Sequence, residues 1–161
     1  MQLSGRGAKE GQAAGSQPTD GAPGLRVDVT SLPDAADVAV LERGLHAYEA
    51  ARLGPPGHGH FAVLLRDDRD RVIGGVDGHV MWRRLFIKTV WLPETVRGRG
   101  WGTRLMQEVE REARRRACLS IWLTALGPRA CHFYRRLGFE VIGVLEDYVL
   151  GEPLYTLHKI F

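Results

Sequence analysis

A glycine-rich segment between an apolar run and an amphipathic run constrains the fold of this chain more than any other feature. The segment reads Arg97-Gly98-Arg99-Gly100-Trp101-Gly102-Thr103. The apolar run at 85–92 before it predicts a strand, and the run after it predicts a helix. A turn of this kind exposes successive backbone N–H groups, and the N-terminus of the helix adds partial positive charge. The segment therefore predicts a binding site for a phosphate or pyrophosphate group.

Two widespread phosphate-binding loops do not fit this segment. A Walker A loop ends in Gly-Lys-Ser/Thr, and no lysine follows these glycines. A dinucleotide-binding loop needs a third glycine where this chain has Thr103 or Leu105. It also needs an acidic residue about 20 positions later, and the stretch 121–124 has none. The ligand is therefore expected to be of another phosphorylated class.

The hydrophobic pattern of the chain predicts a mixed α/β fold with a mostly antiparallel sheet flanked by helices. Strands are predicted at 25–29, 61–65, 72–82, 85–92, 120–126, 141–145 and 155–160. Helices are predicted from Pro33-Asp34 to Leu53, after the glycine-rich segment, and at 129–137. The second helix places Leu105, Met106, Val109 and Ala113 on one face, which is typical of a helix that packs on a core.

Composition divides the chain into a tail and one domain. Residues 1–24 are rich in Gly, Ala, Ser and Gln and contain almost no large apolar residues, so we expect them to be disordered. The domain is predicted to span residues 25–161, a length that permits one real hydrophobic core.

The charge of the chain is mildly basic and locally concentrated. The net charge is +3 and the isoelectric point is about 9.1. Arg97, Arg99 and Arg104 are expected to attract an anionic ligand to the segment. The arginines at 111–116 are interpreted as a solvated helix face. Only two cysteines are present and the sequence has no membrane-spanning run or signal peptide, so we expect a cytoplasmic protein without membrane association.

Two motifs together resemble the GNAT superfamily of N-acetyltransferases. Arg97-x-x-Gly100-x-Gly102 matches the family's Arg/Gln-x-x-Gly-x-Gly/Ala signature. A second segment, Ala130-x-x-Phe133-Tyr134-x-x-x-Gly138-Phe139, is similar to the family's Ala-x-x-Phe-Tyr-x-x-x-Gly-Phe and follows in the same order. The resemblance covers roughly residues 25–161.

The resemblance implies an acetyltransferase that uses acetyl-CoA and needs no metal. In that family the loop amides hold the pyrophosphate, and backbone donors near the end of the preceding strand polarise the thioester carbonyl. The implied cofactor-binding residues are Trp91, Leu92, Arg97, Gly98, Arg99, Gly100, Trp101, Gly102 and Thr103. The implied catalytic residue is Tyr134, which would protonate or hydrogen-bond the departing thiolate. Where many members have an asparagine that contacts the cofactor, this chain has Gly127.

The acceptor and the general base stay open. The acceptor is expected to be an amine on a small molecule or peptide. The resemblance also leaves a homodimer open, because many members of the family are dimers, although no exposed apolar stripe in the sequence argues for one. Candidate bases are Glu94, Asp147 and Glu152, each also readable as a surface charge. The pair His58 and His60 is more typical of polar surface than of a metal site. Two alternatives remain. The first is a non-catalytic acyl-CoA-binding module. The second and weaker one is a nucleic-acid-binding protein that uses the arginine-rich helix, but few aromatic residues lie between those arginines.

Overall fold

A computed structural model describes residues 24–57 and 59–161, and the chain divides into two compact units with a boundary between Ala47 and Tyr48. The predicted disorder of residues 1–24 falls almost wholly outside the described part. The predicted strand at 25–29 is wrong, because this stretch has no regular structure and Val29 is 97% exposed. Alternation over five residues supplies no hydrogen-bonding partner, and a strand is stable only when another strand pairs with it.

The predicted first helix is confirmed as a single long element, α1 (Ala35–Leu53). Asp34 starts it by accepting a hydrogen bond from the backbone N–H of Ala36 at 2.7 Å, as an N-cap residue does. The helix ends before Gly54, whose φ of +79° favours glycine. No described side chain of α1 is buried, so its apolar residues contribute nothing to the core described below.

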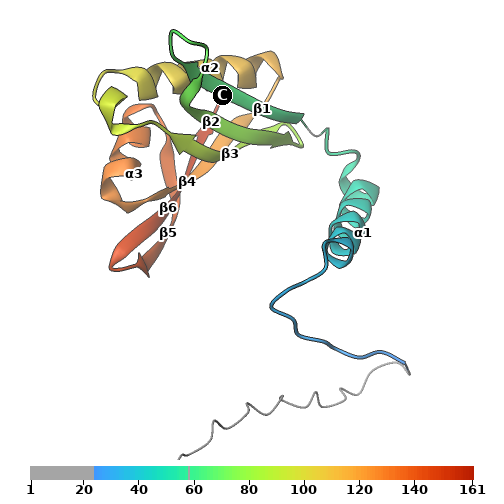
Figure 1. The fold of residues 1–161 in the computed structure, drawn as a ribbon. Coiled ribbons are helices and arrows are strands. Elements are labelled where there is room, and N and C mark those ends of the chain that lie inside the picture. Colours follow the sequence, from blue (N-terminus) through green and yellow to red (C-terminus); the bar gives the residue numbers. More distant parts are fainter. Residues whose placement is uncertain (1–23, 58) are drawn as a thin grey trace, which may run out of the picture. The chain divides into compact units, whose positions relative to one another are not determined.

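The second unit is built on a six-stranded sheet with the order β1-β2-β3-β4-β6-β5 (Figure 1). Its strands are β1 (Gly59–Arg66), β2 (Val72–Met81), β3 (Arg84–Trp91), β4 (Ser120–Leu126), β5 (Glu140–Val149) and β6 (Glu152–Ile160). Only the pair β3 and β4 is parallel, and all other neighbours are antiparallel. The prediction of a mixed, mostly antiparallel sheet is therefore confirmed.

Two helices cover one face of this sheet, α2 (Trp101–Arg115) and α3 (Gly127–Arg136). The register aligns Leu85 with Ile121 and Leu123 with Leu157, so their side chains share one face of the sheet. That face and the helices form a core whose innermost side chains are Val76, Leu85, Met106, Val109, Ile121, Leu123 and Leu157. The predicted apolar face of α2 is buried in this core, as its periodicity indicated.

The observed helices and strands of the second unit begin and end within a few residues of their predicted bounds. Helix α3 begins at Gly127, two positions before the predicted start, and ends before Gly138, whose φ is +83°. A short 3₁₀ helix, η1 (Glu94–Val96), lies between β3 and the glycine-rich segment and was not predicted. Within the described residues, no helix has the length and apolar character that a bilayer crossing requires.

Candidate active site

The site begins where β3 and β4 stop pairing. These parallel strands are paired only over Arg84–Ile87 and Ser120–Leu123. Directly after Ile87, the β2–β3 register shifts so that Lys88 is an extra, unpaired residue of β3. Beyond that point β3 and β4 no longer pair with each other, and their facing edges are open. The glycine-rich segment follows β3 and α3 follows β4, so both lie at this open end of the sheet.

Glycine is required in the loop by its backbone conformation. Gly98 and Gly100 have φ values of +73° and +82°, a region that other residues rarely adopt. A Cβ atom at either position would meet nothing within 4 Å, so open space lies beside the loop backbone. Gly102 differs, because a Cβ there would lie 3.1 Å from Cζ of Phe133 on α3. The third glycine of the loop therefore lets α2 begin close to the aromatic ring of the second motif.

The loop and α3 form two walls of a cavity of about 890 Å³. Of the predicted site residues, eight line it: Trp91, Leu92, Arg97, Gly98, Gly100, Gly102, Thr103 and Tyr134. Arg97 is held in place by a hydrogen bond of 2.8 Å from its Nε to the carbonyl oxygen of Leu92. The predicted residues Arg99 and Trp101 do not line the cavity, and Trp101 instead lies beneath the guanidinium of Arg104 at 4.9 Å.

Tyr134 combines a buried ring with an accessible hydroxyl. Its side chain is 7% exposed, and its ring packs edge-on against those of Phe133 at 5.0 Å and Phe139 at 5.8 Å. No described residue forms a hydrogen bond with the Tyr134 hydroxyl. In the described structure every buried side-chain oxygen or nitrogen has a hydrogen-bond partner, so this hydroxyl oxygen is not a buried atom. Because Tyr134 lines the cavity, its hydroxyl is open to the cavity. Burial raises the pKa of Tyr134 to about 12. The phenol therefore stays protonated at physiological pH and can donate a hydrogen bond.

The polar residues of the α3 wall were not among the predicted site residues. Arg129, His132 and Arg136 line the cavity, at positions i, i+3 and i+7 of the helix. The remaining lining is apolar and comes from Val90, Leu126, Ala130 and Phe133. The spacing of these three residues is visible in the sequence, but nothing in the sequence says which face of α3 meets the cavity.

The candidate bases do not reach this cavity. Glu94, Asp147 and Glu152 are exposed and none is among its lining residues. Glu152 lies near the start of α3, where its Oε2 atom would be 2.7 Å from a Cβ at Gly127. A side chain at position 127 would have to shift only the flexible end of Glu152, whereas the φ of +74° at Gly127 itself favours glycine.

No metal site is found among residues 24–57 and 59–161. His58 lies outside the described residues. His60 is exposed, and its Nδ1 atom is 3.7 Å from a carboxylate oxygen of Asp77. The histidine pair thus contributes one residue to a sheet surface, away from the larger cavity.

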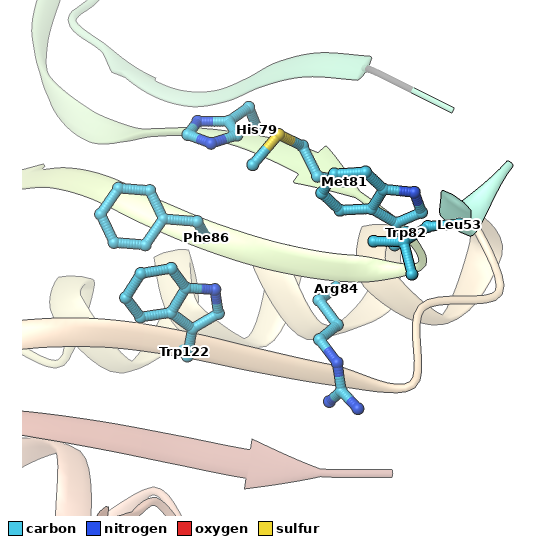
Figure 2. A pocket seen from close by; sticks show the side chains of 7 residues that line it. All are labelled: Leu53, His79, Met81, Trp82, Arg84, Phe86 and Trp122. Atoms are coloured by element: carbon cyan, nitrogen blue, oxygen red, sulfur yellow. The ribbon is translucent and has the colours of Figure 1, made fainter. Parts of the chain in front are cut away.

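A second cavity, of about 380 Å³, has a different character (Figure 2). Figure 2 shows the rings of His79, Phe86 and Trp122 in a row along one side of it, as the strand register places them. The ring centroids of Phe86 and Trp122 are 4.2 Å apart. None of the predicted site residues lines this cavity. We therefore take the larger cavity, between the loop and α3, as the candidate active site.

Comparisons with known proteins agree with the motifs and the fold. Residues 28–139 match the acetyltransferase (GNAT) family. The chain is 31% identical over 133 residues to the acetyltransferase Atu2258 of Agrobacterium fabrum, covering 83% of this chain and 97% of that relative. It is 30% identical over 100 residues to blasticidin-S acetyltransferase of Streptomyces morookaense, covering 62% of this chain and 74% of the relative. A crystal structure from Agrobacterium tumefaciens, assigned as an acetyltransferase, superimposes with a TM-score of 0.81 at 30% identity, covering 85% of this chain and 100% of that one.

The chain therefore belongs to the acetyltransferase (GNAT) family, and it is an acetyl-CoA-dependent N-acetyltransferase. The cavity fits the donor that this class uses. It combines loop amides and cationic side chains, which suit phosphates, with an apolar lining that suits the thioester arm.

Proposed function

We propose that this protein transfers an acetyl group from acetyl-CoA directly to a primary amine of a small molecule or peptide. The observation that carries the proposal is the cavity in which the glycine-rich loop and the open hydroxyl of Tyr134 meet. The relative named for blasticidin-S supports a small-molecule acceptor. In the overall reaction a C–N bond forms, the C–S bond breaks, and the amine loses the proton that the thiol product gains.

The loop residues would bind the diphosphate of acetyl-CoA, and the end of β3 would orient its thioester. Backbone amides of Gly98, Gly100 and Gly102 would hold the diphosphate, with Arg97 beside them. Backbone donors near Trp91 and Leu92 would face the thioester oxygen, because β3 has no partner strand on that side. Acetyl-CoA itself supplies an activated acyl group on a good leaving group.

Tyr134 would stabilise the sulfur as it leaves. Because its pKa is about 12, the phenol is a weaker acid than a thiol, whose ordinary pKa is about 8.5. Complete proton transfer from the phenol to a thiolate is therefore unfavourable. A hydrogen bond from the hydroxyl to the sulfur needs no such transfer, and this is the role we assign to it.

The proposal is tested by incubating the protein with acetyl-CoA and a panel of primary amines. Free thiol is measured with a chromogenic reagent, and acetylated product is measured by mass spectrometry. We expect thiol release that requires one class of amine and is absent when that amine is already acetylated. Binding of acetyl-CoA without amine-dependent release would instead favour the non-catalytic acyl-CoA-binding module.

A further inference from the structure

Helix α3 presents two arginines and a histidine to the cavity. Arg129, His132 and Arg136 are all exposed side chains that line the same cavity as the loop, on the wall formed by α3. The side chains between them that also line the cavity are less exposed, so these three residues form the outer edge of this wall. From this arrangement we propose that Arg129 and Arg136 recognise the 3′-phosphate of coenzyme A. The inference rests on the proposed use of acetyl-CoA at this site.

These two arginines have no anionic partner in the described structure. No ion pair of either arginine occurs among residues 24–57 and 59–161, and neither donates a side-chain hydrogen bond to another described residue. Two arginines of α2 differ, because Arg111 and Arg115 are paired with Glu108 and Glu112. The guanidinium groups on α3 are therefore available to a ligand.

Of the three arginines at 97, 99 and 104, the described cavity lining includes only Arg97. Arg99 does not line the cavity, Arg104 covers the ring of Trp101, and Arg97 donates its Nε–H to the carbonyl oxygen of Leu92. The loop therefore binds mainly through backbone amides, which suits a diphosphate. A further phosphate monoester would have to find its cations elsewhere around the cavity.

The position of Arg129 does not serve the stability of its own helix. It stands in the first turn of α3, which has no acidic residue, so its charge opposes the helix dipole. Arg135 and Arg136 stand in the last turn, where a cation is favourable, yet only Arg136 lines the cavity. Helix stability explains Arg135, whereas it does not explain Arg129.

The chemistry of the donor identifies the matching group. Coenzyme A carries a diphosphate and, on the ribose, a separate 3′-phosphate monoester. A phosphate monoester approaches two negative charges at neutral pH, and arginine pairs with phosphate through two parallel hydrogen bonds. With the diphosphate at the loop amides, the monoester is the anionic group left for the α3 wall.

The test compares coenzyme A with dephospho-coenzyme A, which lacks only the 3′-phosphate. Dissociation constants are measured by calorimetry at physiological salt for the parent, Arg136→Gln, the double variant R129Q/R136Q and the matched control Arg135→Gln. We expect the parent to prefer coenzyme A by about 10-fold or more, the scale of a charge-assisted hydrogen bond. The double variant should lose that preference and keep its affinity for dephospho-coenzyme A, and Arg135→Gln should retain the preference.

Dephospho-coenzyme A also reports whether a variant is folded, because its binding does not need the 3′-phosphate. Equal affinity of the parent for both ligands would overturn the inference and leave the proposed function intact. An equal loss for both ligands in the double variant would also overturn it, since that result indicates only general electrostatic attraction. Failure of the parent to bind either ligand would overturn the proposed function itself.

Discussion

The two walls of the cavity are built in different ways. The loop wall, from Arg97 to Thr103, offers backbone amides, and its shape depends on glycines with positive φ. The α3 wall offers side chains, among them two arginines and the buried ring of Tyr134. A site made from backbone groups can be recognised in the sequence by its glycines, because few other residues adopt a positive φ. A site made from side chains depends on which face of the helix is turned inward.

The largest expected effect lies on the α3 wall. Tyr134→Phe keeps the ring and its packing and removes the hydroxyl. We expect turnover to fall by about 10²-fold, the scale of a lost proton or hydrogen-bond donor, with little change in acetyl-CoA affinity. The control is Tyr155→Phe, a partly buried tyrosine outside the cavity. Once an acceptor is found, steady-state kinetics measure the turnover rates of the parent and both variants. A turnover rate of Tyr134→Phe within a few-fold of the parent would show that Tyr134 is only a packing residue.

The loop wall is tested with Gly100→Asp. The substitution strains a backbone at φ +82° and places a negative charge in the open space beside the loop. We expect acetyl-CoA affinity to fall by about 10-fold or more from charge repulsion at a phosphate site.

Gly151→Asp is the matched control for this substitution. Gly151 has a φ of +81°, also has open space around a Cβ, and lies between β5 and β6 outside the cavity. Both variants are titrated with acetyl-CoA. Their melting temperatures show how much each substitution destabilises the fold through backbone strain. Unchanged affinity in Gly100→Asp would show that the loop is not the phosphate site.

Burial of Tyr134 also predicts a pH effect that the loop wall lacks. In the unfolded chain the phenol ionises near its ordinary pKa of about 10, whereas in the folded protein its pKa is about 12. The unfolded state therefore loses its proton first, and the stability of the parent falls as pH rises through this window. Relative to Tyr134→Phe, the parent should lose about 1 kcal/mol between pH 9 and 11. Denaturant unfolding of both proteins at several pH values measures this, and parallel curves would contradict it.

The smallest expected effect is removal of residues 1–24. Among residues 24–57 and 59–161, no residue that lines the cavity precedes Val90. We expect a chain that starts at Leu25 to keep its melting temperature and its acetyl-CoA affinity. A loss of several degrees in melting temperature would show that these residues stabilise the folded domain.

Local patterns in the sequence do not decide strand pairing or side-chain direction. The strand at 25–29 was predicted from a short alternation, but a strand also needs a partner that a local pattern cannot supply. Arg99 and Trp101 were predicted to bind the cofactor from the family resemblance; their side chains do not line the cavity, and their role stays a prediction. Neighbouring residues in a turn point in different directions, so position in a motif does not fix orientation.

The sequence by itself determined the elements of the sheet and its two packed helices, the family motifs and the glycine conformations of the loop. Each of these follows from local rules, namely periodicity and the restriction of φ. Only the tertiary structure decided that β3 and β4 part after Ile87 and that the Tyr134 hydroxyl opens into the cavity. It alone placed Arg129 and Arg136 on the cavity that the loop also lines. These outcomes depend on packing between segments about 30 residues apart, whose relative orientation is set by the whole core and by no single stretch of chain.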